Sequence, residues 1–401
     1  MVRGNDVKII DMHCDTIHKI WQNNAKENPE ASVHENLESD ELMINLEKMK
    51  QGGYSVQNFA MFIEADDTKD CFKRFNDLLS VFREQMDIYK DIISPVTNAS
   101  EIYENERIGK LSAFLTVEGG EACQGDIEKL HYLYAQGVRM MTLTWNFPNE
   151  LGYPNIDAGK MKFKDDSFRC SPYIPDTTHG LTDKGIEFVR EMERIGMIID
   201  VSHLSDAGFY DVLKYTKKPF VASHSNAREV CPFVRNLTDD MIRQLGERGG
   251  VTGLNYCHDF LFNDTIDEEM RAIAYKYKFA DKGLDNIDNE GKSKDYNDRY
   301  EQDRRIKDNN VSCDRGKIIS ERFMDITYNK IAEHARHIVN VGGMGVLGLG
   351  SDFDGIPCYS GMPEADRLNY LAYALHKQGF SDGQIEDIFY KNVMRVYKEL
   401  K

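Results

Sequence analysis

Short apolar segments recur along almost the whole chain of 401 residues and alternate with stretches of helical pattern. Each segment is rich in branched or aromatic residues and carries few charges before its end, which is typical of strands buried on both faces of a parallel sheet. Strands that alternate with helices favour an α/β fold. We interpret eight segments as strands: Val7–Asp15, Val56–Glu64, Ser112–Glu118, Val138–Trp145, Met197–His203, Pro219–His224, Gly250–Tyr256 and Val346–Asp354.

The intervening segments carry helix signals. Lys73–Tyr89 spaces its apolar residues as a buried helix face would. Thr182 is a candidate N-cap for a helix over Leu181–Ile195, and Ser381 with Gln384 forms a capping-box pattern for a C-terminal helix. Further helices are expected over Glu41–Lys50 and Ile326–Val339.

Eight strands with intervening helices favour a parallel, TIM-like (β/α)₈ barrel. The competing doubly wound sheet needs a Gly-rich phosphate-binding turn after its first strand, and none follows His13–Asp15. We therefore treat residues 1–401 as a single barrel domain, with a charged insertion at about 257–320 between strands seven and eight. The insertion is expected to be helical near Glu268–Phe279 and exposed over Asp281–Asn310, either as a lid or as a solvated excursion.

Composition narrows the range of partners. The net charge of −17 disfavours nucleic acid, because the phosphate backbone would repel such a surface. No apolar run approaches the roughly 18–20 residues of a membrane span. The first residues lead directly into a strand without the pattern of a signal peptide, so we expect either a cytoplasmic protein or a processed exported form.

In a barrel of this type the functional residues lie at the C-terminal ends of the strands. A cluster of buried acids there would repel itself, and bound cations remove that cost. Imidazole nitrogens and carboxylate oxygens are normal zinc ligands, and two ions roughly 3.5–4 Å apart can acidify a bridging water. Asp200, three residues before His203, is expected to face away with a structural role. The strand-end residues that suit metal chemistry are His13, Asp15, Glu118, His203, His224 and Asp352.

At these residues the chain resembles the renal (membrane) dipeptidase family, peptidase family M19, whose members are zinc dipeptidases with an amidohydrolase-like barrel. The resemblance runs nearly end to end and keeps the family's order of motifs. The motifs are Asp11-Met-His-Cys-Asp15, Val117-Glu-Gly-Gly120, Met141-Thr-Leu-Thr144, His179-Gly-Leu-Thr182, Ile199-Asp-Val-Ser-His203, Ala222-Ser-His-Ser225, Arg235-Asn-Leu237 and Gly350-Ser-Asp-Phe-Asp-Gly355.

The resemblance implies two Zn²⁺ ions per chain, bridged by Glu118 and by a water or hydroxide. His13 and Asp15 would bind one ion, and His203 and His224 would bind the other. This assignment agrees with the ligand chemistry at the strand ends.

The resemblance also implies roles outside the metal ligands. Asp352 would transfer the proton, and Arg235 would bind the C-terminal carboxylate of the substrate. Mammalian members carry a substrate-contacting histidine after the Thr-Leu-Thr run, where this chain has Trp145 followed by Asn146. The Trp-Asn form also resembles bacterial members. We therefore place Trp145 and Asn146 in the substrate site, with Asn146 as a helper at the scissile carbonyl.

The function expected is a metallo-dipeptidase that hydrolyses the peptide bond of a small peptide, including dipeptides with a D-residue at the C-terminal position. One alternative is another binuclear-metal amidohydrolase acting on N-acyl amino acids. Deaminases, lactonases and phosphotriesterases often use a carbamylated lysine late in strand four, where this chain has Thr142-Leu-Thr-Trp145. A non-catalytic peptide-binding barrel is a further alternative, and loss of a metal ligand would be its mark. A homodimer is left open.

Overall fold

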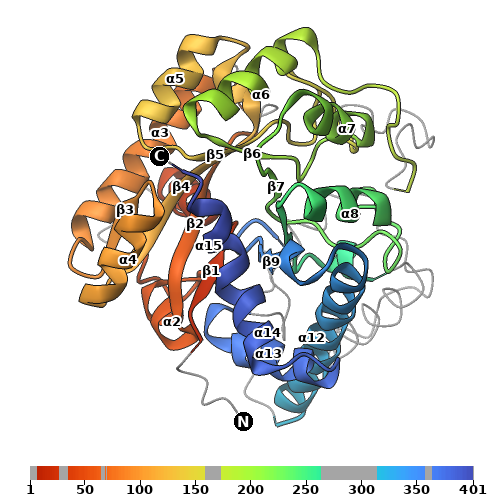
Figure 1. Cartoon of the computed structure of the whole chain (residues 1–401). Coiled ribbons are helices and arrows are strands. Elements are labelled where there is room, and N and C mark those ends of the chain that lie inside the picture. Colours follow the sequence, from red (N-terminus) through yellow and green to blue (C-terminus); the bar gives the residue numbers. More distant parts are fainter. Residues whose placement is uncertain are drawn as a thin grey trace, which may run out of the picture.

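The computed structural model describes residues 7–26, 35–64, 68, 70–158, 173–262, 314–356 and 364–400. In this part of the chain, nine parallel strands form one sheet (Figure 1). Strand β2 pairs with both β1 and β4, so the sheet closes into a barrel, and β3 pairs with the start of β4 outside the ring. The predicted (β/α)₈ barrel is confirmed. The strands are β1 (Ile9–Asp11), β2 (Tyr54–Phe62), β3 (Ile93–Val96), β4 (Leu111–Glu118), β5 (Met140–Thr142), β6 (Ile198–Asp200), β7 (Val221–Ala222), β8 (Val251–Leu254) and β9 (Leu347–Leu349).

Helices surround the strands and connect consecutive ones (Figure 1). Among the described helices, none is both long enough and apolar enough to span a membrane. The helices are α1 (Thr16–Lys26), α2 (Leu46–Gly52), α3 (Cys71–Ile88), α4 (Ala99–Ile108), α5 (Ile127–Ala135), α6 (Asp183–Ile195), α7 (Asp206–Tyr215), α8 (Asp239–Glu247), α9 (His258–Leu261), α12 (Asp314–Gly342), α13 (Leu368–Lys377), α14 (Asp382–Glu386) and α15 (Asn392–Tyr397).

Local capping explains where several helices begin. Thr182 caps α6, and Ser381 with Gln384 forms the predicted capping box of α14. The helix predicted from Glu41 begins only at Leu46, because the side chain of Asn45 accepts a hydrogen bond from the backbone of the new first turn.

Strand β3 is absent from the sequence prediction, since four residues that include a proline give little periodic signal. Every observed barrel strand is contained in or overlaps a predicted one, but most are shorter. The predicted insertion at 257–320 falls between β8 and β9 and includes α9 and the start of α12. The helix predicted near Glu268–Phe279 and the exposed stretch Asp281–Asn310 lie outside the described residues.

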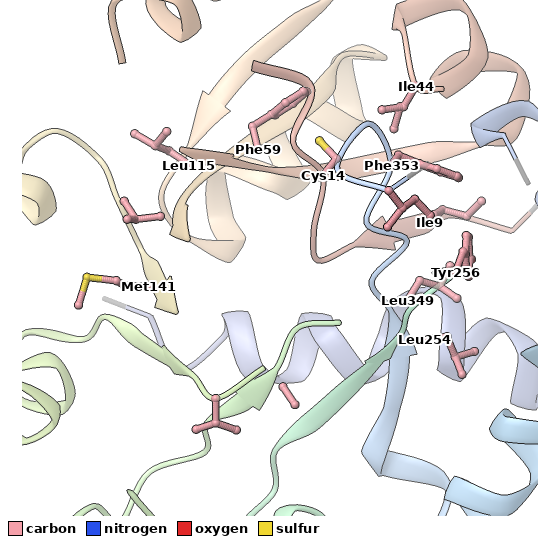
Figure 2. Close-up of a cluster of buried hydrophobic side chains, with 14 of the residues drawn as sticks. Ile9, Cys14, Ile44, Phe59, Leu115, Met141, Leu254, Tyr256, Leu349 and Phe353 are labelled. Carbon is pink, nitrogen blue, oxygen red and sulfur yellow. The ribbon is translucent and has the colours of Figure 1, made fainter. Parts of the chain in front are cut away.

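Residues of β4 alternate between the two sides of the barrel wall. Ala113, Leu115 and Val117 belong to the apolar layer between the strands and the outer helices. Figure 2 shows Leu115 within this layer, among side chains from several other strands. Phe114 packs in a second, inner cluster. Because alternate strand residues face opposite sides, Glu118 points into the barrel at the C-terminal end of β4.

The C-terminal helix α15 covers the opposite end of the barrel, where the strands begin (Figure 1). Its Val396 and Tyr397 share the inner cluster with Val221 and Val251, the first residues of β7 and β8. The ring of Tyr397 stacks on Phe114 with centroids 4.4 Å apart. One end of the barrel is therefore plugged by apolar packing, and the polar residues gather at the other.

Candidate active site

The carboxylate of Glu118 lies at the centre of the predicted metal ligands. Its Oε2 atom is 3.3 Å from Nε2 of His13. Its Oε1 atom is 2.8 Å from Nε2 of His203 and 3.6 Å from Nε2 of His224. Nε2 of His13 is also 3.5 Å from Oδ2 of Asp15. The structure therefore brings together all five residues predicted as metal ligands, with one oxygen of Glu118 toward each side of the cluster.

The imidazoles of His203 and His224 face each other through their Nε2 atoms, which are 3.0 Å apart. Their other nitrogens are occupied: Nδ1 of His203 is 2.9 Å from Oδ1 of Asn146, and Nδ1 of His224 is 2.7 Å from Oγ of Ser223. When Nδ1 carries the proton in each ring, both Nε2 atoms present lone pairs toward the same space. Such an arrangement suits a cation between or beside the two rings.

Unpartnered buried atoms test whether this cluster fits a metal. Nε2 of His13 and Oδ1 of Asp15 are buried and have no hydrogen-bond partner among the described residues. Two overlapping groups have ligand atoms close enough for one ion: His13 with Glu118 and His224, and His13 with Asp15 and Asp352. Nitrogen and carboxylate oxygen form a normal donor set for zinc. The residues present therefore fit a divalent metal.

Several residues of the cluster have pKa values that differ strongly from their ordinary ones. Burial raises the pKa of Asp15 well above its ordinary value, and the nearby charge of Glu118 raises it further. Burial lowers the pKa of His203 to about 4, and the charge of Arg235 adds to this effect. Burial alone would raise the pKa of Glu118, but the charge of His13 and hydrogen bonds from the imidazoles hold it well below its usual range. A bound cation would favour the charged form of these carboxylates and so offset part of the cost of burying them.

Asp352 stands at the edge of the cluster of predicted metal ligands. Its Oδ1 atom is 3.9 Å from Nε2 of His13, and its Oδ2 atom accepts a hydrogen bond of 3.0 Å from Nδ2 of Asn255. Asp352 has a left-handed φ of 65°, and Asp354 has one of 66°. A Cβ atom at Gly355 would meet Oδ2 of Asp15 at 2.0 Å and Oδ1 of Asp352 at 2.7 Å. The turn thus needs glycine at 355 to bring both carboxylates to the cluster.

Arg235 is 3% exposed and poorly satisfied. Its Nη1 atom is 3.3 Å from Oγ of Ser225, and its Nη2 atom is 3.4 Å from the carbonyl oxygen of His224, both long hydrogen bonds. Its Nε has no hydrogen-bond partner in the described part of the chain. Burial lowers the pKa of Arg235 to about 10, so the guanidinium remains charged near neutral pH. A buried guanidinium with long hydrogen bonds beside the predicted metal ligands suits an anionic ligand group.

Aromatic rings line another side of the cluster. The rings of Phe62 and Trp145 meet edge to face with centroids 4.8 Å apart, and Phe147 lies 5.7 Å from Trp145. Phe62 is in register with Glu118 across β2 and β4, and Trp145 lies 6.4 Å from the ring of His203. All three aromatic residues are partly exposed. We call Phe62, Trp145 and Phe147 the aromatic wall.

Asp200 is placed differently from the sequence prediction. Thr142 and Asp200 are in register with each other and with Glu118, so the three side chains share the inner side of the barrel. The expectation that Asp200 faces away from the site is wrong, because β6 ends at Asp200 and the turn leading to His203 does not keep the alternation of a strand.

Several other neighbours of the site are missing from the sequence prediction. Asn255 and Phe62 stand at or just after the ends of β8 and β2, so a search for polar and aromatic residues at every strand end would have found them. Ser223 directly precedes His224, and no spacing rule singles it out.

Comparisons with known proteins agree on one family. The family model for membrane dipeptidases, peptidase family M19, matches residues 4–401. An uncharacterized dipeptidase of Schizosaccharomyces pombe is 27% identical over 411 residues, which cover 98% of this chain and 80% of that protein.

Two solved structures share the fold of the whole chain. One is the dipeptidase AC, a metallo peptidase of family M19, with a TM-score of 0.72, 21% identity and 98% coverage of both chains. The other is a metallo peptidase from Rhodobacter sphaeroides liganded with a phosphinate mimic of the dipeptide L-Ala-D-Ala. Its TM-score is 0.70 at 21% identity, with coverage of 98% of this chain and 99% of that one.

Proposed function

The chain belongs to the membrane dipeptidase family, peptidase family M19, and is a metallo-dipeptidase; from this premise we propose that it uses two zinc ions to hydrolyse dipeptides that carry a free C-terminal carboxylate. The observation that carries the proposal is the position of Glu118, which presents one carboxylate oxygen to His13 and the other to His203 and His224. A carboxylate in that position can bridge two ions.

In this proposal His13 and Asp15 hold one zinc ion, His203 and His224 hold the other, and Glu118 lies between them. Zinc held there would polarise the scissile carbonyl and lower the pKa of a bound water. Nε2 of His13 and Oδ1 of Asp15, which are buried and have no hydrogen-bond partner among the described residues, support these assignments.

Asp352 is proposed to accept a proton from the attacking water and to deliver it to the leaving amine. Its Oδ1 atom faces the cluster, and Asn255 holds its Oδ2 atom from the other side. This contact fixes the carboxylate while leaving one oxygen for proton transfer. Since a peptide nitrogen leaves only after protonation, one residue can serve first as base and then as acid.

Arg235 is proposed to bind the C-terminal carboxylate of the substrate. Its guanidinium is buried, its hydrogen bonds are long, and its Nε has no partner in the described residues. A bidentate carboxylate would satisfy such a fork. Substrates with a D-residue at the C-terminal position are part of the proposal, supported by the L-Ala-D-Ala mimic bound to the Rhodobacter sphaeroides relative.

The aromatic wall is proposed to contact the N-terminal side chain of the dipeptide. Trp145 lies toward β2 and the His203 side of the cluster, whereas Arg235 contacts the segment after β7. Asn146 is proposed to act through His203 rather than on the scissile carbonyl, because its side-chain oxygen contacts the Nδ1 atom of that ring.

A hydrolysis screen tests the proposed function. The purified, zinc-loaded protein is assayed on L,L- and L,D-dipeptides, on their C-terminal amides and on N-acetyl amino acids, with bound metal measured in parallel. Two zinc ions per chain and cleavage of free dipeptides are expected, and His203→Ala should lose one ion and nearly all activity. Cleavage of N-acetyl amino acids alone would favour the alternative amidohydrolase, and failure on the whole panel would overturn the proposal.

A further inference from the structure

The carboxylate of Asp200 is fully buried and is saturated with hydrogen-bond donors. Its Oδ1 atom accepts from the backbone N–H of Ser202 and of Ser223 and from the hydroxyl of Ser202. Its Oδ2 atom accepts from the hydroxyl of Thr142 at 2.7 Å and from that of Ser223. Within the described part of the chain, the hydrogen bonds of this buried carboxylate all come from hydroxyls and backbone amides, so it can fix the orientation of the side chains that donate to it.

The hydrogen bonds around Ser223 can run in one direction only. A carboxylate accepts, so the single hydroxyl proton of Ser223 goes to Oδ2 of Asp200. The oxygen of Ser223 must then accept at its other contact, the 2.7 Å approach of Nδ1 of His224. The proton of His224 therefore sits on Nδ1, and Nε2 is left with its lone pair.

The lone pair of His224 is thereby aimed at the metal cluster. Its Nε2 atom lies 3.6 Å from Oε1 of Glu118 and 3.0 Å from Nε2 of His203. The hydroxyl of Ser202 donates to Oδ1 of Asp200, so it does not compete for the proton of Ser223 although the two oxygens are 3.1 Å apart. The backbone N–H of His224 donates to that same Ser202 oxygen and fixes the residue further.

We propose that Asp200 is a positioning residue that sets the tautomer of His224 through the hydroxyl of Ser223, so that the Nε2 atom of His224 is available to a metal ion. The inference rests on the proposed metal site, in which His224 is a ligand. Groups that orient a ligating histidine in this way typically change metal affinity by about 10–100-fold when they are removed.

Asp200→Asn gives a specific test, because the surrounding backbone dictates how the amide must lie. The N–H groups of Ser202 and Ser223 donate to Oδ1, so the oxygen of the new amide stays there. Its nitrogen then replaces Oδ2 and donates to the hydroxyl oxygen of Ser223. The hydroxyl of Ser223 would turn toward Nδ1 of His224, and the ring proton would move to Nε2, which faces the metals.

The experiment measures the tautomer of His224 by nitrogen NMR in the metal-free protein and zinc affinity by chelator competition. We expect Nδ1–H in the wild type, Nε2–H in Asp200→Asn and a loss of zinc affinity of about 10–100-fold. Ser223→Ala, which removes the link itself, should lower zinc affinity as well, and it keeps the test decisive if Asp200→Asn does not fold.

Thr142→Val is the matched control. The substitution removes the hydrogen bond from Thr142 to the same Oδ2 atom of Asp200. It leaves in place the hydroxyl of Ser223, through which Asp200 is linked to His224. It should keep the wild-type tautomer and zinc affinity. An Nδ1–H tautomer with wild-type affinity in Asp200→Asn, or an equal loss of affinity in Thr142→Val, would overturn the inference. Since the tautomer is read without metal or peptide, a failure of the dipeptidase proposal would be seen separately.

Discussion

The Oδ1 atom of Asn146 lies 2.9 Å from Nδ1 of His203, on the side of the ring that faces away from Glu118. Asn146 follows β5, whereas His203 follows β6, so the contact joins two neighbouring loops at the mouth of the barrel. If the amide oxygen accepts the Nδ1 proton, Nε2 of His203 is left as a metal ligand. The Nδ1 atoms of His203 and His224 thus contact different partners, Asn146 and Ser223.

Asn146→Leu should weaken zinc binding, because it removes the acceptor that orients His203. We expect an affinity loss of about 10–100-fold, measured by chelator competition. Asn146→Asp keeps an acceptor of the same shape and should stay close to the wild type. Wild-type zinc affinity in Asn146→Leu would show that the contact does not orient the ligand.

Arg235→Met should raise KM for dipeptides and lower kcat/KM by at least about 30-fold, equivalent to about 2 kcal/mol for a lost charged hydrogen-bond pair. The measurement compares each dipeptide with its C-terminal amide. The wild type should strongly prefer the free acid, and the variant should lose that preference, because only the acid can pair with the guanidinium.

Folding stability is the control for Arg235→Met. The wild-type guanidinium is buried with long hydrogen bonds, and its Nε has no partner among the described residues, so replacing it with an apolar side chain should not lower the free energy of unfolding by more than about 1 kcal/mol. A large destabilisation with an unchanged acid preference would assign Arg235 to structure instead.

The ends of the strands are the feature from which the sequence best predicts where the candidate site residues lie in the fold. Glu118 is the last residue of β4, and the alternation of apolar residues before it decides that it points inward. His203 and His224 lie in the turns after β6 and β7, so the rule that function gathers at the C-terminal ends of barrel strands brings them to the same place. The apolar segment before each of these histidines is long enough to be recognised as a strand from the sequence.

Polar contacts of the turns are what the sequence does not predict. The bond from His203 to Asn146 depends on how two turns pack, and the bond from His224 to Ser223 depends on the local shape of one turn, because short polar residues in turns have no periodic signal. Asp200 shows the limit most clearly: counting from His203 fails, because the chain leaves the strand between the two residues.

His334 should make stability depend on pH. Its Nδ1 accepts from the backbone of Ala227 and its Nε2 contacts the carbonyl oxygen of Leu261, so the neutral ring satisfies both partners. Burial lowers the pKa of His334 to about 3. In the unfolded chain the pKa is about 6.5. Between pH 6.5 and pH 3 the unfolded chain binds a proton at His334 that the folded protein does not bind. The free energy of unfolding therefore has its full contribution from His334 above pH 6.5 and decreases as the pH drops toward 3.

The contribution of His334 should reach about 1.4 kcal/mol per pH unit below pH 6. Denaturant unfolding of the wild type and of His334→Gln at pH 8, 6 and 5 measures it, with both proteins in the same metal state. The free-energy difference between the two proteins should shrink as the pH falls. A constant difference across the range would mean that His334 is protonated in the folded state as well.

Trp145→Ala should change substrate preference more than overall catalysis. Loss of the indole should lower kcat/KM by about 10-fold for dipeptides with an N-terminal Phe or Leu, and much less for those with Gly. Trp145→Phe keeps an aromatic face next to Phe62 and should stay near the wild type. An equal loss for all N-terminal residues would place Trp145 outside the contact with that side chain.

Gly355→Ala should disrupt the metal site through space alone. The added Cβ would lie 2.0 Å from Oδ2 of Asp15 and 2.7 Å from Oδ1 of Asp352, closer than real contacts allow, so one or both carboxylates must move. Because Asp15 is a proposed ligand, zinc content should fall by at least one ion per chain, as measured by metal analysis, and activity should fall with it. Gly383→Ala adds the same methyl group inside α14, where no atom of the described residues lies within 4 Å, and should leave zinc content unchanged while stabilising the fold by up to about 1 kcal/mol. Full zinc content in Gly355→Ala would show that the turn can accommodate the added Cβ without moving Asp15. The prediction that metal binding requires glycine at position 355 would then be wrong.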